Sequence, residues 1–98
     1  MNAWFDRLRD GVAAELGRDD PAMAAALTLT AQDAQALLDL ARDAAHGSGA
    51  RQYAPLATYL VGRLVELSAG ADPAERARLI EAVARAVRAA GPAGSEPL

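Results

Sequence analysis

Apolar residues recur at intervals of three or four in four separate stretches of this 98-residue chain, with helix-breaking residues between most of them. Residues with this spacing share one face of an α-helix, so each stretch predicts an amphipathic helix. The first should run from Ala3 to Leu16, because Asn2 is placed to cap it and Gly17 to end it. β-Branched residues are few and scattered, which also favours helix over strand.

A short helix should follow the first one. Asp20 comes directly before Pro21, and an acidic cap followed by proline is typical of a helix start. We expect this helix to end near Leu27, where the apolar pattern breaks. The next long helix should begin after Thr30, because Thr30 and Asp33 approximate a capping box, with Asp33 facing water.

The second long helix should end at Gly47, with the only histidine of the chain, His46, in its last turn. Asp39, Arg42 and Asp43 should face water on this helix. Its inward face is expected to consist of Ala34, Leu37, Leu38, Leu40, Ala41 and Ala45.

The third long helix should be the central one. It starts near Pro55, and its apolar residues cover most of its circumference, as is typical of a buried helix. Thr58, Gly62 and Glu66 form a narrow stripe on it, and close packing of a neighbour would offset the low helix propensity of Gly62. The last long helix should begin at Pro73 after an aspartate cap. Its inward residues should be Leu79, Ile80, Val83 and Val87.

Together these stretches predict an all-α fold, a small bundle of four main helices with a short extra helix after the first. We expect a single helical domain over residues 1–90, since a chain of this length makes one domain. The Gly- and Pro-containing segment GPAGSEPL, residues 91–98, should be a disordered tail.

Composition narrows the function classes. The chain has no cysteine, which excludes disulfides and thiolate chemistry. A net charge of −3 without a long basic run disfavours nucleic acid as a partner. No apolar run is long enough to cross a membrane and the first residues lack a signal-peptide core, so we expect a cytoplasmic protein. One histidine among acids is not a zinc site, and no catalytic set stands out; we therefore expect no enzyme activity, metal or cofactor.

The turn between the second and third long helices is the most polar candidate for a site. His46 lies at a helix C-terminus, where the helix dipole favours the imidazolium form. Arg51 follows across the turn, close to the free N–H groups of the next helix, which can bind an anion. Two interpretations stay open. The turn binds a phosphate or carboxylate, or it is a plain corner in which Arg51 pairs with a surface acid such as Asp43.

The same region resembles a known family. LLDLARDAAHG, followed by APLATYLVG, is similar to the signature of a small uncharacterised helical domain family of GC-rich bacteria, mostly actinobacteria, and AWFDRLRDGVAAELG resembles its tryptophan-bearing first helix. Members occur free-standing or fused to the C-terminal side of molybdenum cofactor guanylyltransferase. The individual matches are Leu37, Asp39, Leu40, Ala41, Arg42, Asp43, His46, Gly47, Pro55, Leu56, Thr58 and Leu60. The turn here is longer than that of the family, so Arg51 is a candidate by its position alone.

The resemblance implies a non-enzymatic accessory or adaptor domain in the biosynthesis or delivery of the molybdenum cofactor, molybdopterin guanine dinucleotide. It would dock on the guanylyltransferase or on a molybdoenzyme. The alternatives are a small anion- or nucleotide-binding domain and a self-associating bundle that forms a homodimer. The candidate binding residues for a partner or ligand are Asp39, Arg42, Asp43, His46, Arg51, Thr58 and Tyr59.

Overall fold

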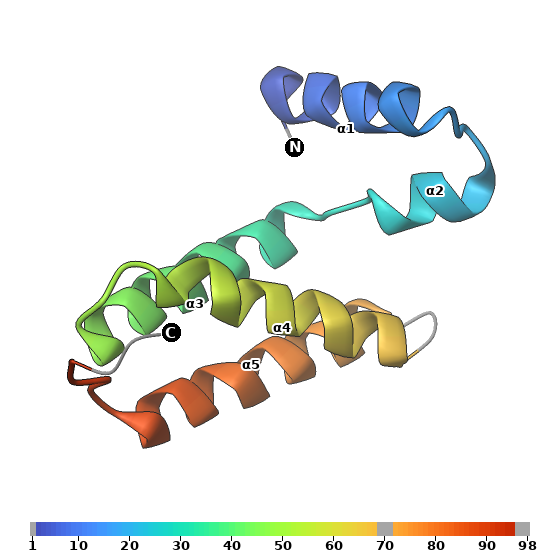
Figure 1. The fold of residues 1–98 in the computed structure, drawn as a ribbon. Helices are drawn as coiled ribbons and strands as arrows, with labels where there is room; N and C mark the ends of the chain where they lie inside the picture. Colours follow the sequence, from blue (N-terminus) through green and yellow to red (C-terminus); the bar gives the residue numbers. More distant parts are fainter. Residues whose placement is uncertain (1, 69–71, 96–98) are drawn as a thin grey trace. The chain divides into compact units, whose positions relative to one another are not determined.

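The computed structural model describes residues 2–68 and 72–95, and these residues form α-helices without any strand (Figure 1). The helices are α1 (Ala3–Leu16), α2 (Pro21–Ala26), α3 (Ala31–Ser48), α4 (Tyr53–Leu67) and α5 (Pro73–Ala90). The predicted all-α class, with four long helices and one short helix, is confirmed. The expected cytoplasmic location stays a prediction. So does the disordered tail expected at residues 91–98, of which residues 96–98 lie outside the described residues.

Local capping bonds set the helix starts as the sequence predicts. Asn2 accepts a hydrogen bond at Oδ1 from the backbone N–H of Phe5 at 2.8 Å. Asp20 accepts one from Met23, and Asp72 accepts one from Glu75. Each bond satisfies an N–H group that the first helical turn leaves without an intrahelical partner.

The chain divides by packing into two units, Met1–Ala31 and Gln32–Leu98, which are described separately. In the first unit, Met23 of α2 is buried, whereas α1 has no buried residue and Trp4 and Leu16 are largely exposed. In the second unit, the start of the segment after α5 is held in place, because Ala93 donates its N–H to the carbonyl of Ser48 at 2.9 Å. The expectation of one domain over residues 1–90 stays a prediction.

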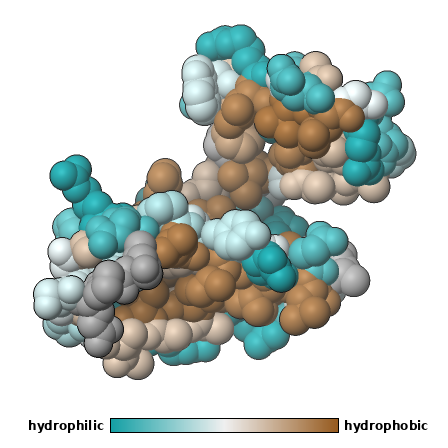
Figure 2. Space-filling model, in the orientation of Figure 1, coloured by the Kyte–Doolittle hydropathy of each residue, from teal (hydrophilic) through white to brown (hydrophobic). Residues whose placement is uncertain are grey.

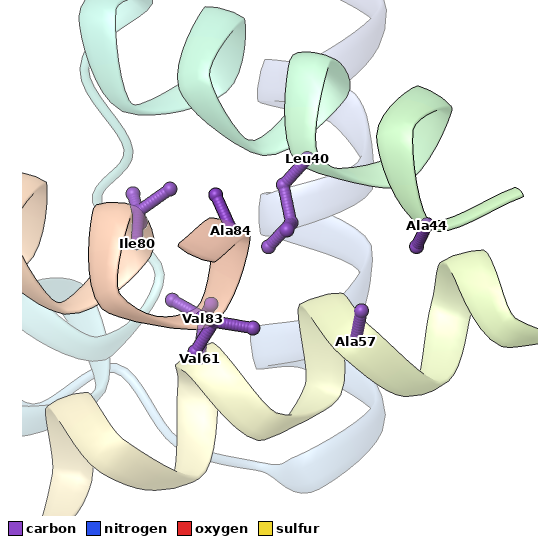
Figure 3. Packing of buried hydrophobic residues seen from close by; sticks show 7 residues of the cluster. All are labelled: Leu40, Ala44, Ala57, Val61, Ile80, Val83 and Ala84. Atoms are coloured by element: carbon purple, nitrogen blue, oxygen red, sulfur yellow. The ribbon is translucent and has the colours of Figure 1, made fainter. Parts of the chain in front are cut away.

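The core of the second unit is small and rich in alanine (Figure 3). Leu40 is its most deeply buried large side chain, at 1% exposure. Alanine side chains from all three helices surround it and allow the helix backbones to approach one another. The buried cluster consists of Leu40 and Ala44 from α3, Ala57 and Val61 from α4, and Ile80, Val83 and Ala84 from α5.

The predicted inward residues of α5 do face the core. The buried face of α3, in contrast, is rotated about the helix axis relative to the predicted face. Leu38, expected inside, is 66% exposed, whereas Ala44 is buried. Helix α3 also continues past Gly47 to Ser48, and Gly49 ends it with a left-handed φ of 80°. The end shifts because Gly49, not Gly47, adopts the conformation that glycine tolerates at low cost.

Helix α4 is not covered all round within its unit, so the prediction of a central helix is wrong there. It buries Ala57 and Val61 on one side only. Leu60 is 56% exposed and Leu67 is 81% exposed. A Cβ atom added at Gly62 would meet no heavy atom within 4 Å, so the expected close approach of a neighbour is also wrong among the described residues.

Asp33 was expected to face water, and this prediction is wrong. Its side chain is 6% exposed, and its Oδ2 lies 3.0 Å from Nη2 of Arg76, a residue in the first turn of α5. The reason is tertiary: α5 packs beside the first turn of α3 and brings a guanidinium to the carboxylate. A buried carboxylate requires such a charged partner.

Candidate functional site

The turn between α3 and α4 satisfies its own polar groups. The Ser48 hydroxyl donates to the carbonyl of Ala50 and accepts from the N–H of Ala50, both at 3.1 Å. Gly49 supplies the left-handed backbone that this arrangement needs. The N–H of Tyr53 then bonds to the carbonyl of Ala50 at 3.3 Å. These hydrogen bonds are therefore all local to the turn between α3 and α4.

His46 and Arg51 are not joined at this corner. Both side chains are exposed, and neither makes a hydrogen bond or ion pair with any residue of the described part of the chain. Gln52, which precedes α4, gives no side-chain cap. Asp43, the expected alternative partner of Arg51, lies 4.0 Å from Arg42 instead. The expected pairing of Arg51 with Asp43 is not found, and anion binding at this turn stays a prediction.

Three of the candidate residues do come together, in a groove between α3 and α5. Asp39, Arg42 and Asp43 line it from α3, and Glu81 and Arg88 line it from α5. The groove has a volume of about 340 Å³. Its alanine-rich floor is formed by Ala36, Ala77 and Ala84.

The charges of this α3–α5 groove largely neutralise one another. Arg42 lies 3.4 Å from Asp39, and Arg88 lies 3.0 Å from Glu81. Arg85 is a second partner of Glu81, at 3.8 Å. No cluster of three metal-ligating side chains occurs in residues 2–68 and 72–95. The arrangement is that of a rim of exposed ion pairs, which contribute little energy individually.

Sequence reasoning missed Glu81 and Arg88 as members of this groove. The Arg85 and Arg88 side chains are exposed, whereas the Arg76 side chain is only 23% exposed. The partners of α3 lie about forty positions further along the chain, and no local spacing could indicate them.

Thr58 and Tyr59, the remaining candidates, differ in what they can contact. The Thr58 hydroxyl donates to the carbonyl of Pro55 at 3.0 Å, so its own helix satisfies it. Tyr59 is exposed, and the guanidinium carbon of Arg63 lies 6.0 Å from the centre of its ring. This cation–π contact places Tyr59 and Arg63 together on the outer side of α4.

Tyr59 belongs to a larger exposed surface, which we call the α4 face. It consists of Leu56, Tyr59, Leu60 and Leu67, all of them exposed. Figure 2 shows hydrophobic surface gathered along this helix and toward α5. Beside it lies a groove of about 470 Å³, lined by Leu56 and Leu60 of α4, by Val87 and Ala90 near the end of α5, and by Pro92. This α4–α5 groove is mainly apolar.

The carboxyl groups of Asp20 and Glu75 have lowered pKa values, and both residues lie at helix starts. The hydrogen bond from Arg18 lowers the pKa of Asp20 to about 2. The hydrogen bond from Arg78 lowers the pKa of Glu75 in the same way. Both pairs are local and exposed, and they stabilise the charged form of a residue in the first turn of a helix.

The fold and these surfaces define a small helical protein with an uncovered apolar helix face. The chain belongs to the family described as a domain of unknown function, DUF6457, whose model matches residues 1–95. No curated protein and no solved structure matches the chain. Among the described helices, none combines the length and the apolar character that crossing a membrane would require.

Proposed function

We propose that this protein is a non-enzymatic docking domain that assists the maturation or delivery of the molybdenum cofactor. It binds the molybdenum cofactor guanylyltransferase or a molybdoenzyme. The observation that supports docking is the α4 face, where four large side chains of one helix are exposed to solvent. Contiguous apolar surface of this kind marks interaction sites in soluble proteins, because its burial is favourable at roughly 25 cal/mol per Å².

We include the molybdenum cofactor in the proposal because of the family resemblance. Leu56 and Leu60 lie in the segment APLATYLVG, which resembles the family signature, yet they lie outside the buried core and are 44% and 56% exposed. A partner that covers the exposed part of these two leucines would add to what they gain by packing within their own unit. A domain that occurs fused to a guanylyltransferase has that enzyme, or the proteins that receive its product, as the natural partner.

The proposed contact centres on the α4 face. Tyr59 adds an aromatic side chain to it, and aromatic residues are enriched where binding energy concentrates. Arg51 lies just before α4. Asp39, Arg42 and Asp43 form the rim of the separate α3–α5 groove, so they are secondary contacts in this proposal.

The test is direct binding between purified proteins. The guanylyltransferase of the same organism, and in a second arm a molybdoenzyme, is immobilised, and the affinities of the wild type, Leu60→Asp and Leu38→Asp are compared by biolayer interferometry. Leu38 is the matched control, because it is an exposed leucine on another helix of the same unit. We expect Leu60→Asp to weaken binding at least tenfold and Leu38→Asp to leave it unchanged. Absence of wild-type binding to both partners, or equal binding by Leu60→Asp, contradicts the proposal.

A further inference from the structure

We infer that the α4 face and the α4–α5 groove receive an amphipathic, acidic helix of the partner protein. This inference rests on the docking function proposed above and names the chemistry of what docks. The first support is the form of the surface. The groove lies between helices, is mainly apolar and has a volume of about 470 Å³, which suits the large side chains of a helix laid into it.

A partner helix suits this surface better than an extended strand does. Adding a strand requires an exposed sheet edge, and residues 2–68 and 72–95 contain no strand. Leu56 and Leu60 are four positions apart on α4, so they form a ridge along one side of the groove. The apolar stripe of a second helix, with residues three and four apart, can pack against such a ridge.

The second support is charge. In the Gln32–Leu98 unit, the arginines on α3 and α5 have carboxylate partners: Arg42, Arg76, Arg78, Arg85 and Arg88. Arg51 and Arg63, which lie just before and on α4, pair with no carboxylate of the described residues. From Arg51 to Ser68 there are two arginines and a single glutamate, in a chain whose net charge is −3.

These two arginines therefore leave positive charge beside an apolar surface. A helix with carboxylates next to its apolar stripe would complement both properties, whereas a basic helix would meet like charge. Complementary charge at the rim mainly affects partner choice, association rate and salt dependence. The acidic residues of the partner thus account for specificity, and its apolar stripe for most of the affinity.

The experiment selects the partner chemistry without assuming a sequence. Displayed helical peptides with a fixed Leu and Phe stripe, and with flanking positions randomised among Glu, Gln and Lys, are panned against the full chain. We expect the retained peptides to be enriched in Glu. Their affinity should fall at least tenfold for Arg51→Glu/Arg63→Glu and should decrease with added salt. Enrichment in Lys or Gln, or no enrichment at all, overturns the inference.

A matched control separates local from overall charge. Arg78→Glu/Arg85→Glu changes the net charge by the same amount on α5, and the two arginines are about equally exposed. We expect this control to bind the selected peptides like the wild type, and Leu60→Asp to lose them. Equal losses for both double variants would mean that overall charge alone governs binding, and would overturn the inference.

Two further outcomes identify other occupants. A dimer of the chain in sedimentation velocity that Leu60→Asp dissociates would assign the α4 face to a second copy and overturn the inference. The binding assay with the guanylyltransferase distinguishes the two proposals. If Arg51→Glu/Arg63→Glu binds the enzyme like the wild type and Leu60→Asp does not, the docking function stands and the acidic helix is wrong. If Leu60→Asp also binds normally, docking through the α4 face is wrong.

Discussion

Two nitrogens of the Arg76 guanidinium contact Oδ2 of Asp33, with Nε at 3.1 Å and Nη2 at 3.0 Å. This pair joins the first turn of α5 to the first turn of α3. The Asp33 side chain is 6% exposed and that of Arg76 is 23% exposed. The carboxylate is out of water and depends on the guanidinium for its stability. Among the side-chain hydrogen bonds described above, it is the one that links residues far apart in the sequence, and Asp33 also lines the α3–α5 groove.

Replacing Arg76 with leucine should therefore remove the guanidinium that lies against the buried carboxylate of Asp33. We expect Arg76→Leu to lower the free energy of unfolding by about 2–4 kcal/mol, slightly below the range for fully buried pairs because Arg76 is partly exposed. Urea denaturation followed by circular dichroism measures the loss. Arg85→Leu, in an exposed pair on the same helix, should change the stability by about 0.5 kcal/mol or less. Similar losses in both variants would show that the Asp33 pair is not specially important.

The helix starts could be predicted from the sequence, because a capping side chain and the backbone N–H that donates to it are three positions apart. Asn2 and Asp72 could be assigned as caps from the sequence, and both make the expected bonds. The pair between Asp33 and Arg76 spans 43 positions and arises only when α3 and α5 pack. The same limit applies to the α3–α5 groove, whose two sides are far apart in sequence.

The burial contrast between Leu40 and Leu38 gives a second prediction. Leu40 is 1% exposed and Leu38 is 66% exposed, although both are leucines two positions apart in α3. We expect Leu40→Ala to cost about 2–5 kcal/mol of unfolding free energy, because it removes core contacts and leaves a cavity. Leu38→Ala should stay within about 0.5 kcal/mol of the wild type. A larger loss for Leu38→Ala in chemical denaturation would mean that α3 is rotated from the orientation described here.

The sequence could not fix this orientation for a physical reason. Helix α3 contains many alanines, which are compatible with either a buried or an exposed position, so several neighbouring faces look apolar. Leu37, Leu38 and Leu40 are each compatible with a buried face, and these faces differ by small rotations of α3 about its own axis. Only the position of the helix packed against α3 decides which of them is buried.

Glycine substitutions should have opposite effects at two positions. Gly62 is in the interior of α4, and a Cβ there meets no heavy atom within 4 Å, so Gly62→Ala should stabilise the chain by about 0.5–1 kcal/mol. Gly49 has a φ of 80°, and Gly49→Ala should destabilise it by about 1 kcal/mol through backbone strain. Thermal unfolding of the two variants beside the wild type measures both. A lower melting temperature for Gly62→Ala would indicate a close neighbour of α4.

Acid titration tests the exposed pair of Arg18 and Asp20. The pKa of Asp20 is lowered to about 2, so the helix-capping carboxylate should stay charged down to that pH. A lowered folded-state pKa means that the contribution to stability is fully present above the ordinary value of 3.8 and is lost as the pH falls through about 2. Carboxyl NMR should show this pKa, and Arg18→Gln should raise it toward 3.8, whereas Arg9→Gln should not. An unchanged pKa in Arg18→Gln would contradict the assigned cause.

The central claim is that the α4 face is where the partner protein docks, and amide NMR tests it most directly. The isotope-labelled chain is titrated with unlabelled guanylyltransferase, and in parallel with the molybdoenzyme. The account predicts that the amide signals of Leu56, Leu60, Arg63 and Leu67 shift or broaden most, while those around Leu38 change little. Changes centred on α3 and Leu38, or no change with either protein, would contradict it.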